Sequence, residues 1–480
     1  MVATATQIQD EQQHIAHLAD VFAKQKVAYA KDMYPSAKQR RDDLDKLAAV
    51  LRKYKDELAT ALNQDFSCRS KDETLLAEIM VTLEGIKYNK KNLKKWMKPS
   101  KRHVSALFAP ASNKVLYQPK GVVGIIAPWN YPIQLSAAPL AAALASGNRA
   151  VIKLSEFTPA TNEVMQRMFA EAFDEDQVAV VLGEASVGAE FSSLHWDHLI
   201  FTGSTMVGRH VMSAAGKNLV PVTLELGGKS PCIITDNASL QGAAESIIFG
   251  KATNAGQTCI APDYILCPEH MLGDVKAQIA QAYKKSYPTI KGNDDYTAII
   301  NERQFNRLQS NLTDAKEKGA TIEPLNHANE DFSGTRKIPL TLVSNTTDKM
   351  MVMQDEIFGP LLPILTYKSL DEALNFINER PRPLALYLFS HNSQEQEHVL
   401  KATHAGGVAI NDCLTHIAQD DMPFGGVGDS GIGHYHGKEG FLSLSHAKAV
   451  HKKGRFNSGK FVYAPHGRLV HRLIYKFIVR

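Results

Sequence analysis

The sequence has few cysteines, five in 480 residues: Cys68, Cys232, Cys259, Cys267 and Cys413. The number is odd, and no two of them have the C-x-x-C spacing of a zinc site or redox motif. Neither a disulfide framework nor a metal site is therefore expected. Scattered cysteines in a chain of this size indicate reduced thiols, and we predict a cytoplasmic protein.

Long hydrophobic runs are also absent, so no segment is expected to cross a bilayer. The chain begins with MVATATQIQDEQQH, which is polar and acidic and argues against a secretion signal. Hydrophobic residues make up 44% and charged residues 22%, the balance of a soluble globular protein. A chain of 480 residues is too long for one core, and two or three domains are expected.

The excess of charge is small, with a net value of +4. This argues against a nucleic-acid-binding protein, which would be more basic. One basic segment, KYNKKNLKKWMKPSKRH at residues 87–103, is expected to be the solvated face of a helix, with a site for an anionic partner as the alternative. Only Tyr88 and Trp96 interrupt it, which is too few aromatic side chains for stacking on bases.

Strand and helix patterns alternate over most of the chain. Helical periodicity dominates the first hundred residues, and from residue 121 short apolar strands such as GVVGIIAP, RAVIKLSE, QVAVVLG and HLIFTGS alternate with helical segments. Strands that are apolar on both faces are typical of a parallel sheet covered by helices. After Cys259 the alternation resumes with DYILCP, GPLLPILTY, LALYLFS and GGVAIND, which predicts a second α/β domain.

Ligands of open parallel sheets bind at the carboxyl ends of strands, so residues just after each predicted strand are candidates. In FTGSTMVG, Gly203 and Ser204 stand between a strand and a helix that includes Gly208, where backbone N–H groups suit a pyrophosphate. The alternative is a tight turn that needs glycine for its backbone conformation. In VIKLSE, Lys153 and Glu156 are placed to contact an adenosine ribose, or else they form an ordinary exposed strand end.

Two further strand ends carry groups suited to carbonyl chemistry. Asn130, in PWNYP, is placed to donate its amide N–H to a developing oxyanion, a contribution of about 3 kcal/mol, or it caps the following helix. Glu225, in TLELGGKSP, has apolar neighbours, so its pKa is expected to be raised, which suits a general base. The alternative is a glutamate on an edge strand that points to water.

Cys259 follows a polar turn in the segment NAGQTCIAP. An unperturbed thiol is only about 3% ionised at pH 7, so a nucleophilic cysteine needs help from its surroundings. This segment alone leaves a nucleophile and a structural cysteine as open alternatives. The combination with Asn130, Glu225 and two nucleotide-type strand ends favours aldehyde oxidation. In that reaction a thiolate attacks the carbonyl, an amide stabilises the oxyanion, hydride passes to a nicotinamide, and water hydrolyses the resulting thioester.

Seven segments in the same order mark a resemblance to the aldehyde dehydrogenase family along almost the whole chain: PWNYP, VIKLSE, FTGSTMVG, LELGGKSP, NAGQTCIAP, DEIFGP and PFGGVGDSG. The resemblance implies an α/β fold with a Rossmann-type parallel-sheet cofactor domain, a second α/β catalytic domain and a small β oligomerisation arm. It also implies that Cys259 is the nucleophile, that Glu225 is the base for deacylation, and that Asn130 forms the oxyanion hole with the backbone N–H of Cys259.

The resemblance implies a nicotinamide cofactor and the residues that contact it. These are Lys153 and Glu156 at the adenosine ribose, Gly203 and Ser204 at the pyrophosphate, Glu356 and Phe358 at the nicotinamide ribose and ring, and in addition Trp129, Gly208 and Leu226. Because Glu156 stands beside Lys153, we predict NAD over NADP. No metal is expected.

The segment AQDDMPFGGVGDSGIGHYHGKEGF resembles the class 3-like and coniferyl aldehyde dehydrogenase group of the family. That group implies a homodimer, NAD with NADP as the alternative, and an aldehyde that is either aromatic, such as coniferyl aldehyde, or medium- to long-chain aliphatic. The implied domains are an NAD(P)-binding domain at residues 1–103 and 121–224 and a catalytic domain at residues 225–415. Residues 104–120 and 416–480 would form the oligomerisation arm and the tail.

Two segments of the implied arm, RHVSALFAPASNKVLYQPKG and SHAKAVHKKG, are expected to form a small sheet that crosses to the partner subunit. The tail RLVHRLIYKFI has apolar residues on one helical face, with Arg472 and Lys476 off that face. We expect a helix packed on its own protein, with peripheral contact to a membrane surface as the alternative.

Two other functional classes remain for comparison. One is a cysteine-dependent esterase or hydrolase that uses the same thiol, and the other is a non-catalytic protein that keeps the fold. The presence of Glu225 favours hydrolysis of a thioester over its transfer to phosphate or coenzyme A.

Overall fold

The computed structural model describes the backbone of residues 5–479 and the side chains of residues 11–479. A six-stranded sheet has the order β15-β7-β6-β3-β4-β5, and only the pair of β15 with β7 is antiparallel. Its strands are β3 (Val122–Ile126), β4 (Arg149–Lys153), β5 (Val178–Val181), β6 (His198–Thr202), β7 (Val222–Glu225) and β15 (Gly431–Ile432). The chain runs from β3 outward to β5 and then returns to the other side of β3 as β6. The strand order therefore reverses between β3 and β6, which is where such sheets bind ligands.

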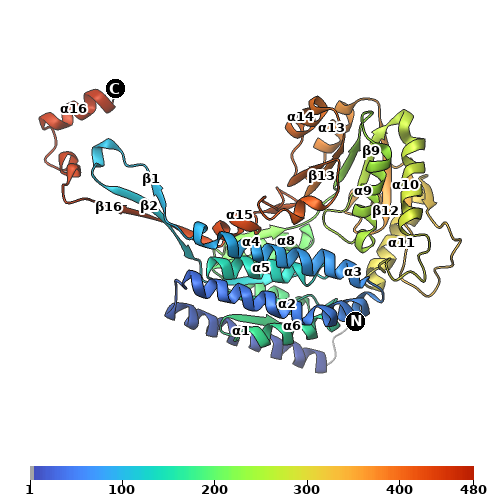
Figure 1. Cartoon of the computed structure of the whole chain (residues 1–480), viewed down its shortest axis with the longest axis horizontal. Coiled ribbons are helices and arrows are strands. Elements are labelled where there is room, and N and C mark those ends of the chain that lie inside the picture. Colours follow the sequence, from blue (N-terminus) through green and yellow to red (C-terminus); the bar gives the residue numbers. More distant parts are fainter. Residues whose placement is uncertain (1–4, 480) are drawn as a thin grey trace.

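Helices bury both faces of this sheet (Figure 1). One face is covered by α2 (Ala37–Phe66), α4 (Val81–Trp96), α5 (Gln134–Ser146) and α6 (Pro159–Ala172). The other face is covered by α1 (Ala5–Lys31), α7 (Ala185–Ser193) and α8 (Thr205–Lys217). Burial on both faces explains why the strand sequences are continuously apolar.

A seven-stranded sheet forms a second α/β unit, with the order β10-β11-β12-β9-β8-β13-β14. Its strands are β8 (Pro231–Ile234), β9 (Tyr264–Pro268), β10 (Thr321–Pro324), β11 (Thr341–Ser344), β12 (Leu361–Tyr367), β13 (Ala385–Phe389) and β14 (Gly407–Ile410). Its helices are α9 (Leu240–Ala252), α10 (Leu272–Ser286) and α11 (Glu302–Glu317) on one face and α13 (Leu370–Asn378) and α14 (Ser393–Ala402) on the other. The two α/β units confirm the predicted fold class.

A three-stranded antiparallel sheet projects from the body as an arm (Figure 1). It consists of β1 (Ser100–Arg102), β2 (Ser112–Pro119) and β16 (Ser445–Lys452). The register of β2 with β16 runs from Ser112 opposite Lys452 to Pro119 opposite Ser445. The predicted pairing of these two distant segments is confirmed, whereas contact of the arm with a partner subunit stays a prediction.

Local boundaries differ from the sequence expectations in three places. The basic segment 87–103 is not one helical face, because α4 ends at Trp96 and Ser100–Arg102 form β1. The segment PIQLSAAPLAAALASGN predicts a helix that starts at Pro132, but α5 begins at Gln134. Strand β15 lies within residues 416–480, yet it extends the first sheet beside β7 and does not belong to the arm.

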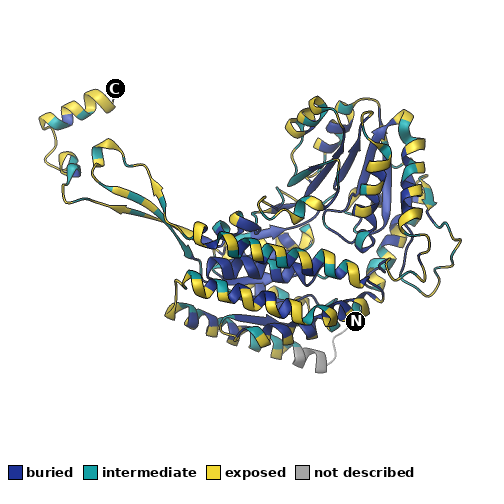
Figure 2. Cartoon of the chain, viewed as in Figure 1, coloured by how far each residue is buried: buried dark blue, intermediate teal, exposed yellow. Residues whose placement is uncertain are grey.

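Helix α16 (Leu469–Ile478) lies at the far end of the arm, and most of it is exposed (Figure 2). Leu469 is 73% exposed and Phe477 69%, whereas the buried residue of the helix is His471. The expectation that the apolar face packs on the same chain is therefore wrong, since the helix turns its histidine side toward the protein. Within residues 5–479, no helix has the length and apolar character needed to cross a membrane.

Candidate active site

The predicted site residues of the first sheet gather along its carboxyl edge. Trp129 and Asn130 follow β3, Lys153 ends β4, Gly203 follows β6, and Glu225 ends β7. Because parallel strands present their carboxyl ends on one edge, the topology alone brings these residues to the same side of the sheet.

Asn130 is buried, and its side chain is turned toward the segment that carries Cys259. The Asn130 Nδ2 atom donates to the carbonyl oxygen of Gln257 at 3.1 Å. The start of α5 is capped instead by Glu78, whose Oε2 accepts from the backbone N–H groups of Ile133 at 2.7 Å and Gln134 at 3.0 Å. The helix-cap alternative for Asn130 is therefore wrong, and one amide hydrogen of Nδ2 is left for another acceptor.

Cys259 is partly exposed as a residue, and it packs against the core of the second unit. Burial of the thiol group, together with the charges of Glu356 and Glu225, raises the pKa of Cys259 to about 12. The backbone N–H groups of Cys259 and Ile260 act in the opposite direction but less strongly. The expectation that the surroundings ionise this sulfur is therefore not met in the protein alone.

Glu225 is buried at the end of β7, with 2% of its surface exposed. Burial raises the pKa of its carboxyl group well above the ordinary value, as predicted. Neither carboxyl oxygen has a hydrogen-bond partner among the described residues. A carboxyl group that points to water is thereby excluded.

Glu356 and Phe358 lie against the first sheet although they come from the second unit. A Cβ added to Gly227 would overlap the Glu356 carboxylate, so these two residues are in close contact. Burial, and next the charge of Asp263, raise the pKa of Glu356 to about 8. The Phe358 ring meets Trp129 edge-on, with 5.3 Å between the ring centroids. The structure thus brings the predicted residues of both units to one interface.

The residues predicted to hold the adenosine half also lie together. Lys153 is buried, and its Nζ lies 3.3 Å from Glu156 Oε2, so this is not an ordinary exposed strand end. The side chain of Ser204 caps α8 by accepting from the N–H of Val207 at 3.4 Å. Gly203 does not have a positive φ, so the tight-turn explanation for this glycine is wrong.

Gly208 lies on α8 and Leu226 follows β7, and the two are in close contact. A Cβ on Gly208 would lie 2.7 Å from the Leu226 side chain, so one of the two residues would have to shift. The backbone N–H of Leu226 donates to the carbonyl oxygen of Ser430 at 3.1 Å. Leu226 is therefore fixed between the start of α8 and the segment PFGGVGDSG.

Sequence reasoning missed several polar residues that support the site. Arg69 is fully buried and donates to the carbonyl oxygen of Asn130 at 2.6 Å. Arg307, on α11, donates to the carbonyl oxygen of Ile357 at 2.7 Å, and Asp263 accepts from the N–H of Ile357 at 2.9 Å. None of these contacts has a local sequence signal, because each joins segments that are far apart in the chain.

Tyr435 is a further residue of this region that the sequence did not single out. It is buried, and its hydroxyl group has no hydrogen-bond partner among the described side chains and backbone. Burial first, and then the charges of Glu225 and Cys259, raise the pKa of Tyr435 well above its ordinary value. The segment GHYHG therefore approaches the same group of side chains.

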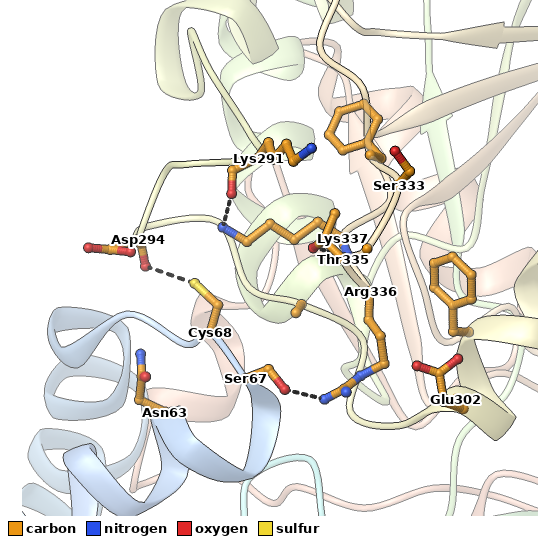
Figure 3. A pocket seen from close by; sticks show the side chains of 14 residues that line it. Asn63, Ser67, Cys68, Lys291, Asp294, Glu302, Ser333, Thr335, Arg336 and Lys337 are labelled. Atoms are coloured by element: carbon orange, nitrogen blue, oxygen red, sulfur yellow. Dashed lines mark hydrogen bonds between the residues drawn. The ribbon is translucent and has the colours of Figure 1, made fainter.

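A separate cavity of about 700 Å³ opens between the end of α2 and the second unit (Figure 3). Arg336 donates to Ser67 Oγ at 2.6 Å across it, and Lys337 donates to the carbonyl oxygen of Asn293 at 2.7 Å. None of the predicted site residues lines this cavity.

Comparison with known proteins agrees with this geometry. Residues 4–450 match the model of the aldehyde dehydrogenase family. The chain is 54% identical over 480 residues, all of both chains, to a probable coniferyl aldehyde dehydrogenase of Pseudomonas aeruginosa PAO1. It is 44% identical to the coniferyl aldehyde dehydrogenase of Pseudomonas sp. HR199, with 95% of each chain covered.

Solved structures of other proteins also match this fold. A substrate-bound AldH of Staphylococcus aureus superposes with a TM-score of 0.90 at 39% identity, covering 96% of this chain and 99% of that one. A betaine aldehyde dehydrogenase of Staphylococcus aureus in complex with NAD+ superposes with a TM-score of 0.81 at 26% identity, covering 91% and 87%. The chain belongs to the aldehyde dehydrogenase family.

The enzyme is thus an oxidoreductase that oxidises an aldehyde with a nicotinamide cofactor. The relatives do not favour the alternative of a cysteine-dependent esterase. They also support the predicted resemblance to the coniferyl aldehyde dehydrogenase group.

Proposed function

We propose that the enzyme converts an aromatic aldehyde of the coniferyl type to its carboxylic acid, with Cys259 as the nucleophile and Glu225 as the base. The observation that carries the proposal is the convergence of three groups. They are the thiol of Cys259, the buried Glu225 carboxyl group, which has no hydrogen-bond partner among the described residues, and the fixed side-chain amide of Asn130. Medium- and long-chain aliphatic aldehydes are the alternative substrate class.

In the first half of the proposed reaction, the Cys259 sulfur adds to the aldehyde carbon and the carbonyl oxygen becomes an oxyanion. The free Nδ2 hydrogen of Asn130 and the backbone N–H of Cys259 donate to that oxyanion. Because the pKa of Cys259 is raised to about 12, the thiol must transfer its proton as it attacks. The thiol proton leaves to solvent, and the raised pKa of Glu225 suits it to accept a proton in the second half.

Loss of hydride from the carbon of this adduct gives a thioester. In the second half, Glu225 takes a proton from water while the water oxygen attacks the thioester carbon. The carbon–sulfur bond then breaks, the acid leaves, and Cys259 regains its thiol. Burial of Glu225 among apolar neighbours favours this role, because it raises the proton affinity of the carboxylate.

The residues at the carboxyl edge fit a dinucleotide. Glycine at position 203, the capped amino end of α8 and the Lys153–Glu156 pair are suited to phosphate and ribose groups. Glu356 and Phe358 would hold the nicotinamide ribose and ring, with Trp129, Gly208 and Leu226 as the remaining contacts. When bound, the cofactor supplies the hydride acceptor for the oxidation. The Glu156 carboxylate favours NAD, because it would repel the 2′-phosphate of NADP.

Steady-state rates with aromatic and aliphatic aldehydes, each with NAD and NADP, test this proposal. The expected outcome is the highest kcat/KM with coniferyl aldehyde and NAD. A clear preference for aliphatic aldehydes would move the substrate class to the alternative, and a preference for NADP would contradict the proposed role of Glu156.

We also propose a homodimer in which the arm and α16 contact a second copy of this chain. Nine Lys and Arg residues but no Asp or Glu follow Glu439. Because the whole chain has a net charge of only +4, the residues up to Glu439 carry a net negative charge, which complements this basic tail. The exposed apolar residues of α16 need a cover, which a second copy supplies. Light scattering should show that Leu473→Glu converts the dimer to a monomer. If the mass is unchanged, and the wild type binds anionic vesicles whereas this variant does not, α16 contacts a membrane surface instead.

A further inference from the structure

The two segments that would build the oxyanion site are joined by a buried network outside the reacting groups. Asn254 Nδ2 donates to the carbonyl oxygen of Asn130 and to that of Gln257, both at 3.0 Å. Asn130 Nδ2 donates to the same Gln257 oxygen at 3.1 Å. A single side-chain amide thus ties the strand end of the first unit to the turn that precedes Cys259.

That turn has a backbone conformation that needs support. Asn254 (φ 52°, ψ 29°) and Ala255 (φ 50°, ψ 36°) are left-handed, and Gly256 also has a positive φ of 72°. Left-handed residues other than glycine persist only where their surroundings hold them. The Gln257 side chain provides such support, since it donates to the carbonyl oxygens of Asn254 at 3.0 Å and Ala298 at 3.1 Å.

Arg69 holds the other segment. Its guanidinium group is fully buried, donates to the carbonyl oxygen of Asn130 at 2.6 Å and lies 3.2 Å from Glu78 Oε1. Glu78 in turn accepts from the first N–H groups of α5. The guanidinium carbon stands 4.7 Å from the centre of the Tyr131 ring, whose hydroxyl group is 2.9 Å from Thr258 Oγ1.

We propose that Asn254 and Arg69 are positioning residues that lock the Asn130 amide and the Cys259 backbone N–H into one oxyanion site. This inference rests on the proposed roles of Asn130 and Cys259. Neither Asn254 nor Arg69 would touch the substrate. They act on the reaction by fixing the carbonyl oxygens around which the two donors are oriented.

The test uses p-nitrophenyl acetate, which acylates Cys259 without any cofactor. The sulfur attacks the ester carbon, the oxyanion forms, and p-nitrophenolate leaves, so the rate of the first turnover reports on the oxyanion site. Asn130→Ala should slow this step by about 10²- to 10³-fold. Asn254→Ala should slow it by about 10- to 100-fold, as expected for a donor that is misplaced rather than removed.

A double-mutant cycle separates positioning from a structural role. If Asn254 acts through Asn130, the variant with both substitutions acylates no more slowly than Asn130→Ala alone. The amplitude of the first turnover counts the folded sites. If Asn254 has only a structural role, Asn254→Ala lowers this amplitude and leaves the acylation rate unchanged. The proposal would be overturned if the double variant is slowed by the product of the two single-variant factors, or if Asn254→Ala acylates at the wild-type rate.

Arg69→Lys provides a second variant if Asn254→Ala fails to fold. It keeps the positive charge but loses the guanidinium geometry, and it should slow acylation by about 10-fold. Matched controls are Asn148→Ala and Arg40→Lys, because Asn148 and Arg40 are equally buried but lie at the opposite edge of the first sheet, beside Gly121 and Ala145. Both controls should acylate at the wild-type rate. A normal rate for Asn130→Ala would instead refute the proposed role of Asn130 itself, and the positioning role with it.

Discussion

The backbone N–H of Gly203 donates to the backbone carbonyl oxygen of Glu225 at 3.0 Å. This bond joins the end of β6, where the pyrophosphate is expected, to the residue proposed as the base. The two sites are therefore built on neighbouring strands of one rigid sheet, and their spacing is set by strand pairing rather than by loops.

Cys259→Ser should abolish aldehyde oxidation, with kcat at least ~10³-fold lower, because a serine hydroxyl is far harder to ionise than a thiol. Cofactor binding, measured by calorimetry, should be unchanged. The matched control is Cys68→Ser, at the rim of the separate cavity, which should keep full activity. Turnover by the Cys259 variant would remove that residue from its proposed role.

Glu225→Gln should leave the rate of the first half of the reaction unchanged. It should slow the second half by about 10²- to 10⁴-fold, since an amide accepts no proton from water. Rapid mixing should show one equivalent of NADH per site, followed by very slow turnover. If the first equivalent is lost as well, Glu225 is needed before the thioester forms and acts mainly on the Cys259 proton.

Glu156→Gln should raise kcat/KM with NADP relative to NAD, by roughly tenfold, because the carboxylate that opposes a 2′-phosphate is removed. Lys153 remains beside position 156 in this variant and would attract the phosphate. If the ratio of kcat/KM with NADP to kcat/KM with NAD is the same in the variant and the wild type, Glu156 does not set the preference for NAD.

Glu356→Gln should change how stability depends on pH. The folded protein keeps the Glu356 proton up to about pH 8, whereas the unfolded chain releases it near 4.5. The free energy of unfolding of the wild type therefore falls as pH rises between these values. The variant lacks this fall. Its free energy of unfolding in urea should therefore exceed that of the wild type by ~2–4 kcal/mol at pH 8. Glu269→Gln, at an exposed position, is the matched control.

Much of this arrangement could be predicted from short sequence signals. Apolar strands, helix starts and strand-end residues such as Lys153 and Gly203 follow from local patterns, because the carboxyl edge of a parallel sheet gathers residues regardless of sequence distance. The packing of Glu356 against Gly227 could not be predicted in the same way, since it depends on how two units meet.

Burial was harder to predict than position. The sequence places Cys259 in a polar turn, but the raised pKa of its thiol comes first from burial and then from the carboxylates at positions 356 and 225, which approach only in space. Asn254 belongs to the quoted motif, yet its left-handed conformation and its bonds to Asn130 have no signature beyond a neighbouring glycine. Helix α16 was expected to hide its apolar face, and the fold leaves that face uncovered.

The most direct test is to mix Glu225→Gln enzyme with coniferyl aldehyde and NAD, stop the reaction in acid, and determine the mass of the peptide that contains Cys259. The proposed chemistry requires that this peptide carries the acyl group of the product acid as a thioester, in proportion to the NADH formed. NADH formation with an unmodified Cys259, or an acyl group on another residue, would contradict it.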